Sequence, residues 1–473
     1  MKKSDMRKSR AFSPFRLLAV ASGIVCLASL LMVVGVRAQS GAQDPGVRPG
    51  PAAAGKFFPT LTQQQKSLGP LLIQNFNQVF GVTTTESGVA GLGPRFNSNE
   101  CELCHSQPAA GGSSTFVNQA FLVYNDDGAI NTIPYFESSA GAMQNARFPQ
   151  QLGNLGVPDG LVHAVFTITG RADAGSCDIA QPDFSEAQSE NNIIFRVPPP
   201  MFGGGLMEII REKDILANQS AQCAQEASTG ICGTPNYASD GSIGRFGWKA
   251  QNRSALIFIS EALTGEMGVT DEAFPNESDE TTGCVINGVP EDHSNFATKV
   301  APSSFPGTPE RLALFVRFLA PPTPAPPNST TMNGQNQFNF VGCNICHSSP
   351  SPTQFVTPVS SISALSTQPA NLFSDILVHH MGNCLADGVT QGAAAGDMFR
   401  TAPLWGVGQR IFFMHDGRTT DIVQAVEDHS DSFCTGSAGQ TGYPASEADA
   451  VINAFNALTV QNQQDLIDFI RSL

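Results

Sequence analysis

The sequence is poor in basic residues, tyrosine and tryptophan, and it has no long apolar run after residue 36. Only 26 Lys and Arg stand against 41 Asp and Glu, which gives a formal net charge of -15. This acidity disfavours nucleic acid and anionic membranes as partners and would attract a basic protein. Without a second apolar run, the rest of the chain should have no membrane-spanning segment. At 473 residues the chain exceeds one ordinary core, so two domains are expected.

The first 38 residues have the pattern of an export signal. Basic residues precede an apolar run over 17–36, and Val36-Arg37-Ala38 offers a small-residue cleavage site. The run is also long enough for an uncleaved membrane anchor, which is the alternative. We expect cleavage, which changes the charge to about -21 and implies a periplasmic or otherwise exported protein without stable membrane insertion.

Two copies of Cys-x-x-Cys-His are the most specific signal in the sequence. They lie at Cys101–His105 and Cys343–His347, named here the first and second haem motifs. Two thiols at this spacing can bond the vinyl groups of a haem while the next histidine ligates its iron, so each motif predicts a covalently bound haem c. Zinc, a thioredoxin-like dithiol and disulfide cysteines are the alternatives. Zinc would require both motifs to converge on one ion, and a dithiol leaves the histidine unexplained.

Six cysteines remain after the four motif cysteines and Cys26 of the signal are set aside. In an oxidising compartment they predict three disulfides, although the sequence does not fix their pairing. Closeness along the chain favours Cys223 with Cys232 and Cys384 with Cys434. The other two are Cys177 and Cys284.

The helix signals divide the chain into two modules. A helix is expected over 61–80 before the first haem motif, a second over 311–319 after Thr308-Pro309-Glu310, and a third over 461–473 at the end. Each module therefore has a haem motif near its start and a helix at its end. Between the modules, the prolines of 321–327 predict a stiff connector.

The predicted fold is mainly α, with two cytochrome c-like haem domains. The N-terminal one is expanded by roughly 150 residues of loop-rich, partly β sequence. The expected divisions are a signal peptide at 1–38, a disordered segment at 39–56, an N-terminal haem domain at 57–320, a linker at 321–334 and a C-terminal haem domain at 335–473.

Further stretches surround the two haem motifs in a fixed order. They are Pro108 with Gly111-Gly112, Phe195–Pro200 with Phe202-Gly203, Gly244–Ala250, Gly265–Gly268, Ser374–Leu377 with Met381-Gly382, Arg400–Gly406 and His415–Arg418. In this order the chain resembles the di-haem oxidoreductase/putative peroxidase family, also called thiol oxidoreductases. That family is related to bacterial di-haem cytochrome c peroxidases and to the tryptophan-modifying enzyme MauG.

The resemblance implies that the N-terminal haem is peroxidatic. Trp248 occupies the position of a tryptophan between the two haems, and Glu266 that of the acid that moves a proton between the peroxide oxygens. Many relatives have Asp there. No histidine occurs between His105 and His163, so a five-coordinate haem is expected with His105 below and Glu266 above, and His163 is a fallback ligand. The alternatives are a core tryptophan and a solvated carboxylate at a helix end.

The resemblance also implies a sixth ligand for the C-terminal haem, 14 residues after His415. Relatives have Met or Tyr at this position and this chain has His429, which predicts a low-spin haem held by His347 and His429 that transfers electrons. The alternative ligands are Met414, Met381 and His379. His415, Asp416 and Arg418 are expected to order the haem and its propionates.

These expectations combine into an exported di-haem c-type enzyme. It would reduce hydrogen peroxide or a similar small oxidant at the N-terminal haem, with electrons from a soluble redox protein passing through the C-terminal haem. Calcium between the haems is a further family expectation, but the two ligand positions hold Arg410 and Phe412, so no ligand is assigned. The alternatives are an electron-transfer cytochrome without peroxidase activity and a di-haem oxygenase acting on an organic substrate.

Overall fold

Capping side chains set the starts of the main helices in the computed structural model, which describes residues 41–83, 89–293, 307–348, 355–435 and 441–473. Before α2 (Gln63–Phe76), the Thr62 hydroxyl accepts from the backbone of Gln65, whose side chain accepts from the backbone of Thr62. Ser254 caps α9 (Ala255–Met267) and Thr459 caps α15 (Val460–Ser472), each with a side-chain hydroxyl that accepts from one backbone N–H of the first turn. The predicted signal peptide lies outside the described residues.

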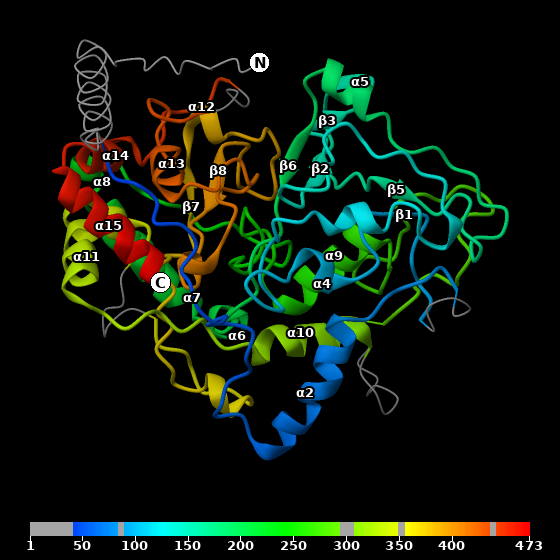
Figure 1. The fold of residues 1–473 in the computed structure, drawn as a ribbon, viewed down its shortest axis with the longest axis horizontal. Helices are drawn as coiled ribbons and strands as arrows, with labels where there is room; N and C mark the ends of the chain where they lie inside the picture. Colours follow the sequence, from blue (N-terminus) through cyan, green and yellow to red (C-terminus); the bar gives the residue numbers. More distant parts are fainter. Residues whose placement is uncertain (1–40, 84–88, 294–306, 349–354, 436–440) are drawn as a thin grey trace, which may run out of the picture. The chain divides into compact units, whose positions relative to one another are not determined.

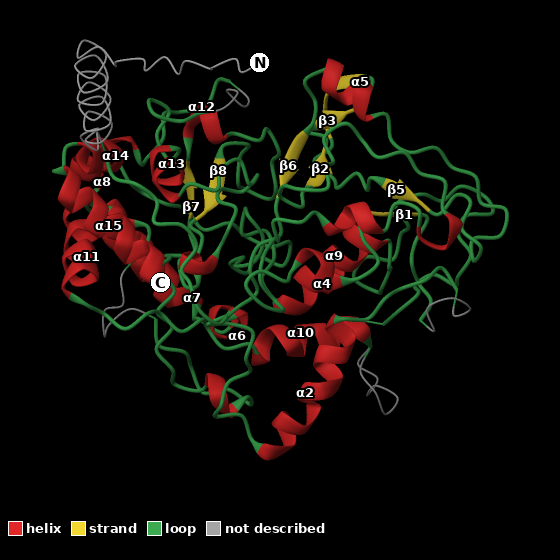
Figure 2. Cartoon of the chain, viewed as in Figure 1, coloured by secondary structure: helices red, strands yellow, loops and turns green. Residues whose placement is uncertain are grey.

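Helices are the main regular element, and strands occur only in two-stranded pairs (Figure 2). The remaining α-helices are α4 (Cys101–Cys104), α5 (Phe184–Ser189), α6 (Gly204–Glu208), α7 (Glu212–Cys223), α8 (Glu226–Thr229), α10 (Thr308–Phe318), α11 (Ser329–Val341), α12 (Gly382–Leu385), α13 (Ile422–Glu427) and α14 (Asp449–Asn456). The short 3-10 helices are η1 (Gln119–Leu122), η2 (Asp126–Gly128), η3 (Cys343–Ile345), η4 (Ser363–Leu365) and η5 (Val407–Gln409).

The four strand pairs are all antiparallel. They are β1 (Arg95–Phe96) with β5 (Phe166–Thr167), β2 (Asn145–Arg147) with β6 (Ile194–Arg196), β3 (Gln150–Gln151) with β4 (Asn154–Pro158), and β7 (Val378–His380) with β8 (Met398–Arg400). Two of these pairs, β2 with β6 and β3 with β4, lie between the two haem motifs, where the partly β insertion was predicted, whereas β1 precedes the first motif. The mainly helical fold class agrees with the prediction at this level.

Gln43–Leu473 form one compact unit, and within it two helix pairs repeat the same plan. α2 precedes the first haem motif and packs on α10, and α11 precedes the second and packs on α15 (Figure 1). Phe76 stacks on Phe315 across the first pair at 4.4 Å between ring centres, and Phe338 meets Phe469 edge to face across the second at 5.5 Å. The helices predicted at 61–80, 311–319 and 461–473 are thus present, with slightly different ends.

Residues 43–56, part of the segment predicted to be disordered, follow a defined path beside the C-terminal module instead. The carboxylate of Asp44 pairs with Arg471 of α15 at 2.5 Å and accepts from the backbone of Ile422. The backbone N–H of Arg48 donates to Gly408. Composition alone indicated disorder because these partners lie far away in the sequence.

The proline-rich connector is shorter than the predicted range of 321–334. α11 begins at Ser329, where Asn328 caps it, so only the residues up to 328 are extended. The backbone of Thr323 donates to Ala53 and that of Ala325 donates to Ser472, which fastens the connector to both ends of the unit.

Three disulfides link the six cysteines outside the haem motifs. Cys223 pairs with Cys232 and Cys384 with Cys434, as chain proximity favoured, and Cys177 pairs with Cys284. The four motif cysteines keep free thiols. None of the helices within the described ranges is both long and apolar enough to cross a membrane.

Candidate haem sites

The second haem motif holds its histidine in a fixed orientation. His347 follows η3, and its Nδ1 donates to the carbonyl oxygen of Phe373 at 2.9 Å. Because a carbonyl only accepts, Nδ1 carries the proton and Nε2 keeps its lone pair. Burial lowers the pKa of His347 to about 4, so the ring is neutral at pH 7 and its lone pair is free to bind a metal.

His429 faces His347, and its ring is also buried and oriented by a backbone carbonyl. It follows α13, and its Nδ1 donates to the carbonyl oxygen of Ala425 at 2.8 Å, which again leaves Nε2 with the lone pair. Burial lowers the pKa of His429 as well. The two ring centres are 6.4 Å apart, with 68° between the ring planes.

This separation fits one metal ion between the two rings. An imidazole nitrogen binds a transition metal at about 2.0 Å and lies about 1.1 Å from its ring centre, so two rings across one iron have centres about 6.3 Å apart. The observed 6.4 Å therefore matches a metal bound by both Nε2 atoms. The residues present fit the haem that the second motif predicts.

The alternative sixth ligands line the same cavity as the two rings, but each has other contacts. His379 contacts Asp375 through Nε2 at 2.9 Å and Glu447 through Nδ1 at 2.7 Å. Burial opposes its charge, but Cys346 and Asp375 raise the pKa of His379 well above its ordinary value. Met381 and Met414 pack on the apolar cluster around Trp248. Cys346, Asp375 and His379 are also the one group within the described residues with metal-binding spacing.

The cavity around His347 and His429, named here the C-terminal cavity, has a volume of about 210 Å³. Its wall includes the thiols of Cys343 and Cys346, so both predicted attachment points face the space that the two imidazoles flank. His415 also lines it, stacked on Phe399 with ring centres 4.3 Å apart. Burial lowers the pKa of His415 to about 4, which keeps the ring neutral.

Trp248 separates this cavity from a second, smaller one. The small cavity, about 40 Å³, lies against Met207, Phe246 and Phe258 of the N-terminal module, and the indole lines both spaces. The indole Nε1 donates to the carbonyl oxygen of Val197 at 2.9 Å, which fixes the plane of the ring. The predicted bridging tryptophan thus lies at the boundary between the two modules.

Two arginines near these cavities differ in their partners. Arg418, predicted to meet the propionates, pairs with Asp416 at 2.7 Å and is absent from the wall of the C-terminal cavity. Arg410 lines both cavities, with its Cζ 5.6 Å from the centre of the Trp248 ring. The sequence prediction included Arg410 only as a residue that does not suit a calcium site.

The first haem motif forms the short helix α4, and the following loop orients His105. The Nδ1 of His105 donates to the carbonyl oxygen of Gly112 at 2.9 Å, and burial lowers the pKa of His105 to about 4. A Cβ on Gly112 would lie 2.0 Å from the carbonyl oxygen of Gln107, so only glycine allows this loop to close. His105 therefore offers its Nε2 lone pair as His347 does.

Glu266, at the end of α9, is held by two amides. Asn97 donates to one carboxylate oxygen at 2.7 Å and Asn145 to the other at 2.8 Å. Asn97 follows β1, just before the first haem motif, and Asn145 begins β2 in the insertion after it. Neither was predicted, because lone amides beside short strands have no characteristic sequence pattern.

A second carboxylate lies near the first motif. Burial raises the pKa of the Cys104 thiol, and the nearby charges of Glu266 and Glu137 raise it further. Burial also raises the pKa of Glu137 to about 7, although the Asn118 amide that donates to it opposes the shift. His163, the fallback ligand, instead contacts Asp159 at 3.2 Å and stacks on Phe148.

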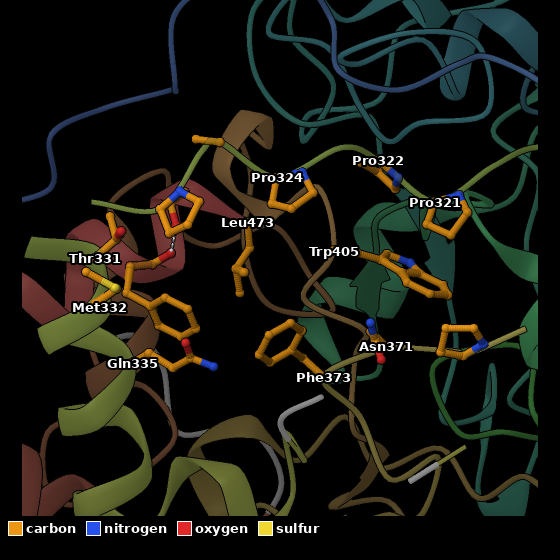
Figure 3. A pocket seen from close by; sticks show the side chains of 15 residues that line it. Pro321, Pro322, Pro324, Thr331, Met332, Gln335, Asn371, Phe373, Trp405 and Leu473 are labelled. Carbon is orange, nitrogen blue, oxygen red and sulfur yellow. Dashed lines mark hydrogen bonds between the residues drawn. The ribbon is translucent and has the colours of Figure 1, made fainter. Parts of the chain in front are cut away.

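The proline-lined pocket is the largest of the three cavities described here, at about 370 Å³ (Figure 3). The connector prolines form one side, and Met332, Phe373 and Trp405 line the rest. Phe373 is also the residue whose carbonyl oxygen orients His347, and Trp405 also lines the small cavity. The pocket thus lies behind the loop that positions the second motif.

Comparisons with known proteins agree with these features. Residues 158–473, about two thirds of the chain, match the family described as "Di-haem oxidoreductase, putative peroxidase". This range contains the second haem motif, Trp248, Glu266 and His429, and the first motif precedes it. No curated protein matches the chain.

Two solved structures show a distant similarity. A MauG-like protein associated with microbial copper homeostasis is 14% identical over 56% of this chain and 89% of its own, with a TM-score of 0.30. Hydrazine synthase from Kuenenia stuttgartiensis is 19% identical over 35% of this chain and 55% of its own, with a TM-score of 0.22. The chain thus spans about half of that synthase chain, and at these scores neither likeness establishes a common fold.

Proposed function

Because the chain belongs to the di-haem oxidoreductase, putative peroxidase family, we propose that it reduces hydrogen peroxide or a similar small oxidant at the N-terminal haem. Electrons reach that haem from the C-terminal one. Haem iron supplies a site that binds the oxidant and exchanges electrons with it. Each peroxide consumes two electrons and two protons and gives two waters.

This proposal rests on the different surroundings of the two motif histidines. His429 stands opposite His347 at the separation that one iron requires, which closes the C-terminal haem to small ligands and suits it to electron transfer. None of the other seven histidines, all within the described residues, is placed in this way opposite His105. The N-terminal haem is therefore the one with an open position.

Glu266 is the proton carrier of the open site. Its two amide partners hold the carboxylate in one orientation without neutralising it, and each oxygen still has a lone pair that can accept a proton. A proton taken from the near oxygen of a bound peroxide can then be passed to the far oxygen. Glu137, whose pKa lies near 7, is a second group that can supply protons to this region.

Trp248 carries electrons between the two sites. Its indole belongs to the walls of both cavities, so the π-system of the ring lies on a path for electrons between the modules. The hydrogen bond to Val197 keeps the ring in place. We assign no residues to calcium.

Covalent attachment and export belong to the same proposal. The four motif cysteines are the free thiols among the described residues, as attachment to two haems requires, and the three disulfides suit an oxidising compartment. The electron donor is a small, basic, soluble redox protein, because the strong negative charge of this chain attracts such a partner.

The spin states of the ferric protein, read by absorption and EPR, test the proposal. We expect one low-spin haem and one high-spin haem per chain, with only the high-spin signal changing when peroxide is added. Two low-spin haems that ignore peroxide would identify an electron-transfer cytochrome. Oxygen uptake without peroxide consumption would instead identify an oxygenase.

A further inference from the structure

Arg410 occupies an unusual position for a cation. It follows η5, is buried, and lies on the wall that the small cavity and the C-terminal cavity share, above the ring of Trp248. Two of its side-chain nitrogens, Nε and Nη2, have no hydrogen-bond partner anywhere in the described part of the chain. No other buried arginine there leaves two nitrogens unsatisfied.

Most other buried arginines have a carboxylate. Arg196 pairs with Asp387, Arg171 with Asp173 and Arg471 with Asp44. Arg400, on the same shared wall as Arg410, is satisfied by the carbonyl oxygens of Gly247 and Thr401. Arg410 has neither kind of partner, and burial alone lowers its pKa to about 10, which leaves the group charged at pH 7.

A buried guanidinium without a hydrogen-bond partner is unfavourable, because the contact with the indole replaces only part of the hydration that the charge has lost. The fork of an arginine fits a carboxylate, which accepts two parallel N–H bonds. The group expected in the adjoining cavity brings carboxylates with it, since haem carries two propionates. The missing partner and the expected cofactor therefore have complementary chemistry.

We propose that Arg410 binds a propionate carboxylate of the C-terminal haem at the side of the cavity that faces Trp248. This assignment rests on the proposed binding of a haem between His347 and His429. Arg410 then takes the role that the family resemblance implied for Arg418, whose guanidinium is already paired with Asp416. The bound carboxylate also neutralises a cation that would otherwise sit against the indole.

Arg410 should raise the reduction potential of the C-terminal haem, because it offsets the negative charge of a propionate that would otherwise stabilise the ferric form. The test is a potentiometric titration of the haem-loaded protein, followed through the low-spin haem. We compare Arg410→Met, Arg410→Lys and the wild type. Arg471→Met is the matched control: Arg471 is also a buried arginine over an aromatic ring, Phe413, but it has its own carboxylate and does not line the cavity.

At the potential where half of the wild-type low-spin haem is reduced, Arg410→Met should lower its ferrous to ferric ratio at least tenfold, a shift of about 59 mV for one electron. Arg410→Lys should retain most of the wild-type potential, and Arg471→Met should shift it little. Loss of haem from Arg410→Met but not from Arg410→Lys would also support the pairing.

Equal shifts in Arg410→Met and Arg471→Met would overturn the assignment. A wild-type potential that changes when chloride replaces acetate at constant ionic strength would overturn it too, since the partner would then be a free anion. Absence of low-spin haem in the wild type would instead defeat the proposed function on which the inference rests. The two failures are therefore distinguishable.

Discussion

Replacing His429 with alanine should open the C-terminal haem. An iron bonded to His347 lies about 3.1 Å from the centre of that ring, so about 3.3 Å of the observed 6.4 Å is left for the second imidazole. Without that imidazole, a water molecule or a peroxide fits at the vacated position. Met381 and Met414 also line the C-terminal cavity, but both pack on the cluster around Trp248 and are not expected to replace the lost ligand.

The substitution is expected to change the spin state of one of the two haems. In the wild type about half of the ferric haem should be low-spin, and in His429→Ala nearly all of it should be high-spin and responsive to peroxide. EPR quantified against total haem measures both fractions. His293→Ala is a suitable control, because His293 is exposed and pairs with Glu272. His429→Met should restore a low-spin haem and raise its reduction potential.

A low-spin fraction unchanged in His429→Ala would refute the reasoning. It would mean that the facing rings do not share an iron and that another side chain closes the haem. The same measurement on Met381→Ala and Met414→Ala would then identify that side chain. Loss of haem content, measured by pyridine haemochrome, would separate a folding defect from a change of ligand.

Two further predictions concern the N-terminal site. Glu266→Gln should slow the reaction with peroxide roughly 100- to 10,000-fold without lowering haem content, while Glu261→Gln on the same helix should not, as stopped-flow mixing with peroxide can show; equal rates would mean that Glu266 is not the acid. Because the folded pKa of Glu137 is raised to about 7, the stability from this group is full below about pH 4.5 and is lost as the pH rises through 7. Glu137→Gln should therefore be more stable than the wild type at pH 8, by at most about 3 kcal/mol, and equal to it at pH 4.5, as urea unfolding at both values can measure; a constant difference would argue against a raised pKa.

Local sequence signals were sufficient for the elements whose determinants are local. α15 lies where its apolar spacing predicted it, and α10 contains Pro309 near its start, as the Thr308-Pro309-Glu310 pattern predicted. Two disulfides followed from short separations along the chain. His429 is placed opposite His347, but its expected position came from a resemblance in spacing and not from a local pattern.

The contacts that shape the candidate sites were not predictable in this way. Asn97 and Asn145 converge on Glu266 because two strand pairs, β1 with β5 and β2 with β6, bring them there. Asp44 reaches Arg471 across almost the whole chain, so a segment of disordered composition becomes ordered. Such partners are brought together by tertiary packing, and one sequence alone does not show which distant residues will be in contact.

The two modules share one scaffold and differ in what faces the motif histidine. In both, a helix before the motif packs on the module's last helix, and a backbone carbonyl accepts a hydrogen bond from Nδ1 of the motif histidine. In the C-terminal module the facing group is the buried imidazole of His429, which is proposed to bind the haem iron and to exclude other ligands. In the N-terminal module the group expected above the haem is Glu266, a carboxylate already engaged by two amides and better suited to accepting a proton than to closing the iron. Under the proposed function, the two haem sites differ in the side chain that faces the motif histidine, so the variants at His429 and Glu266 should have opposite effects on reactivity with peroxide.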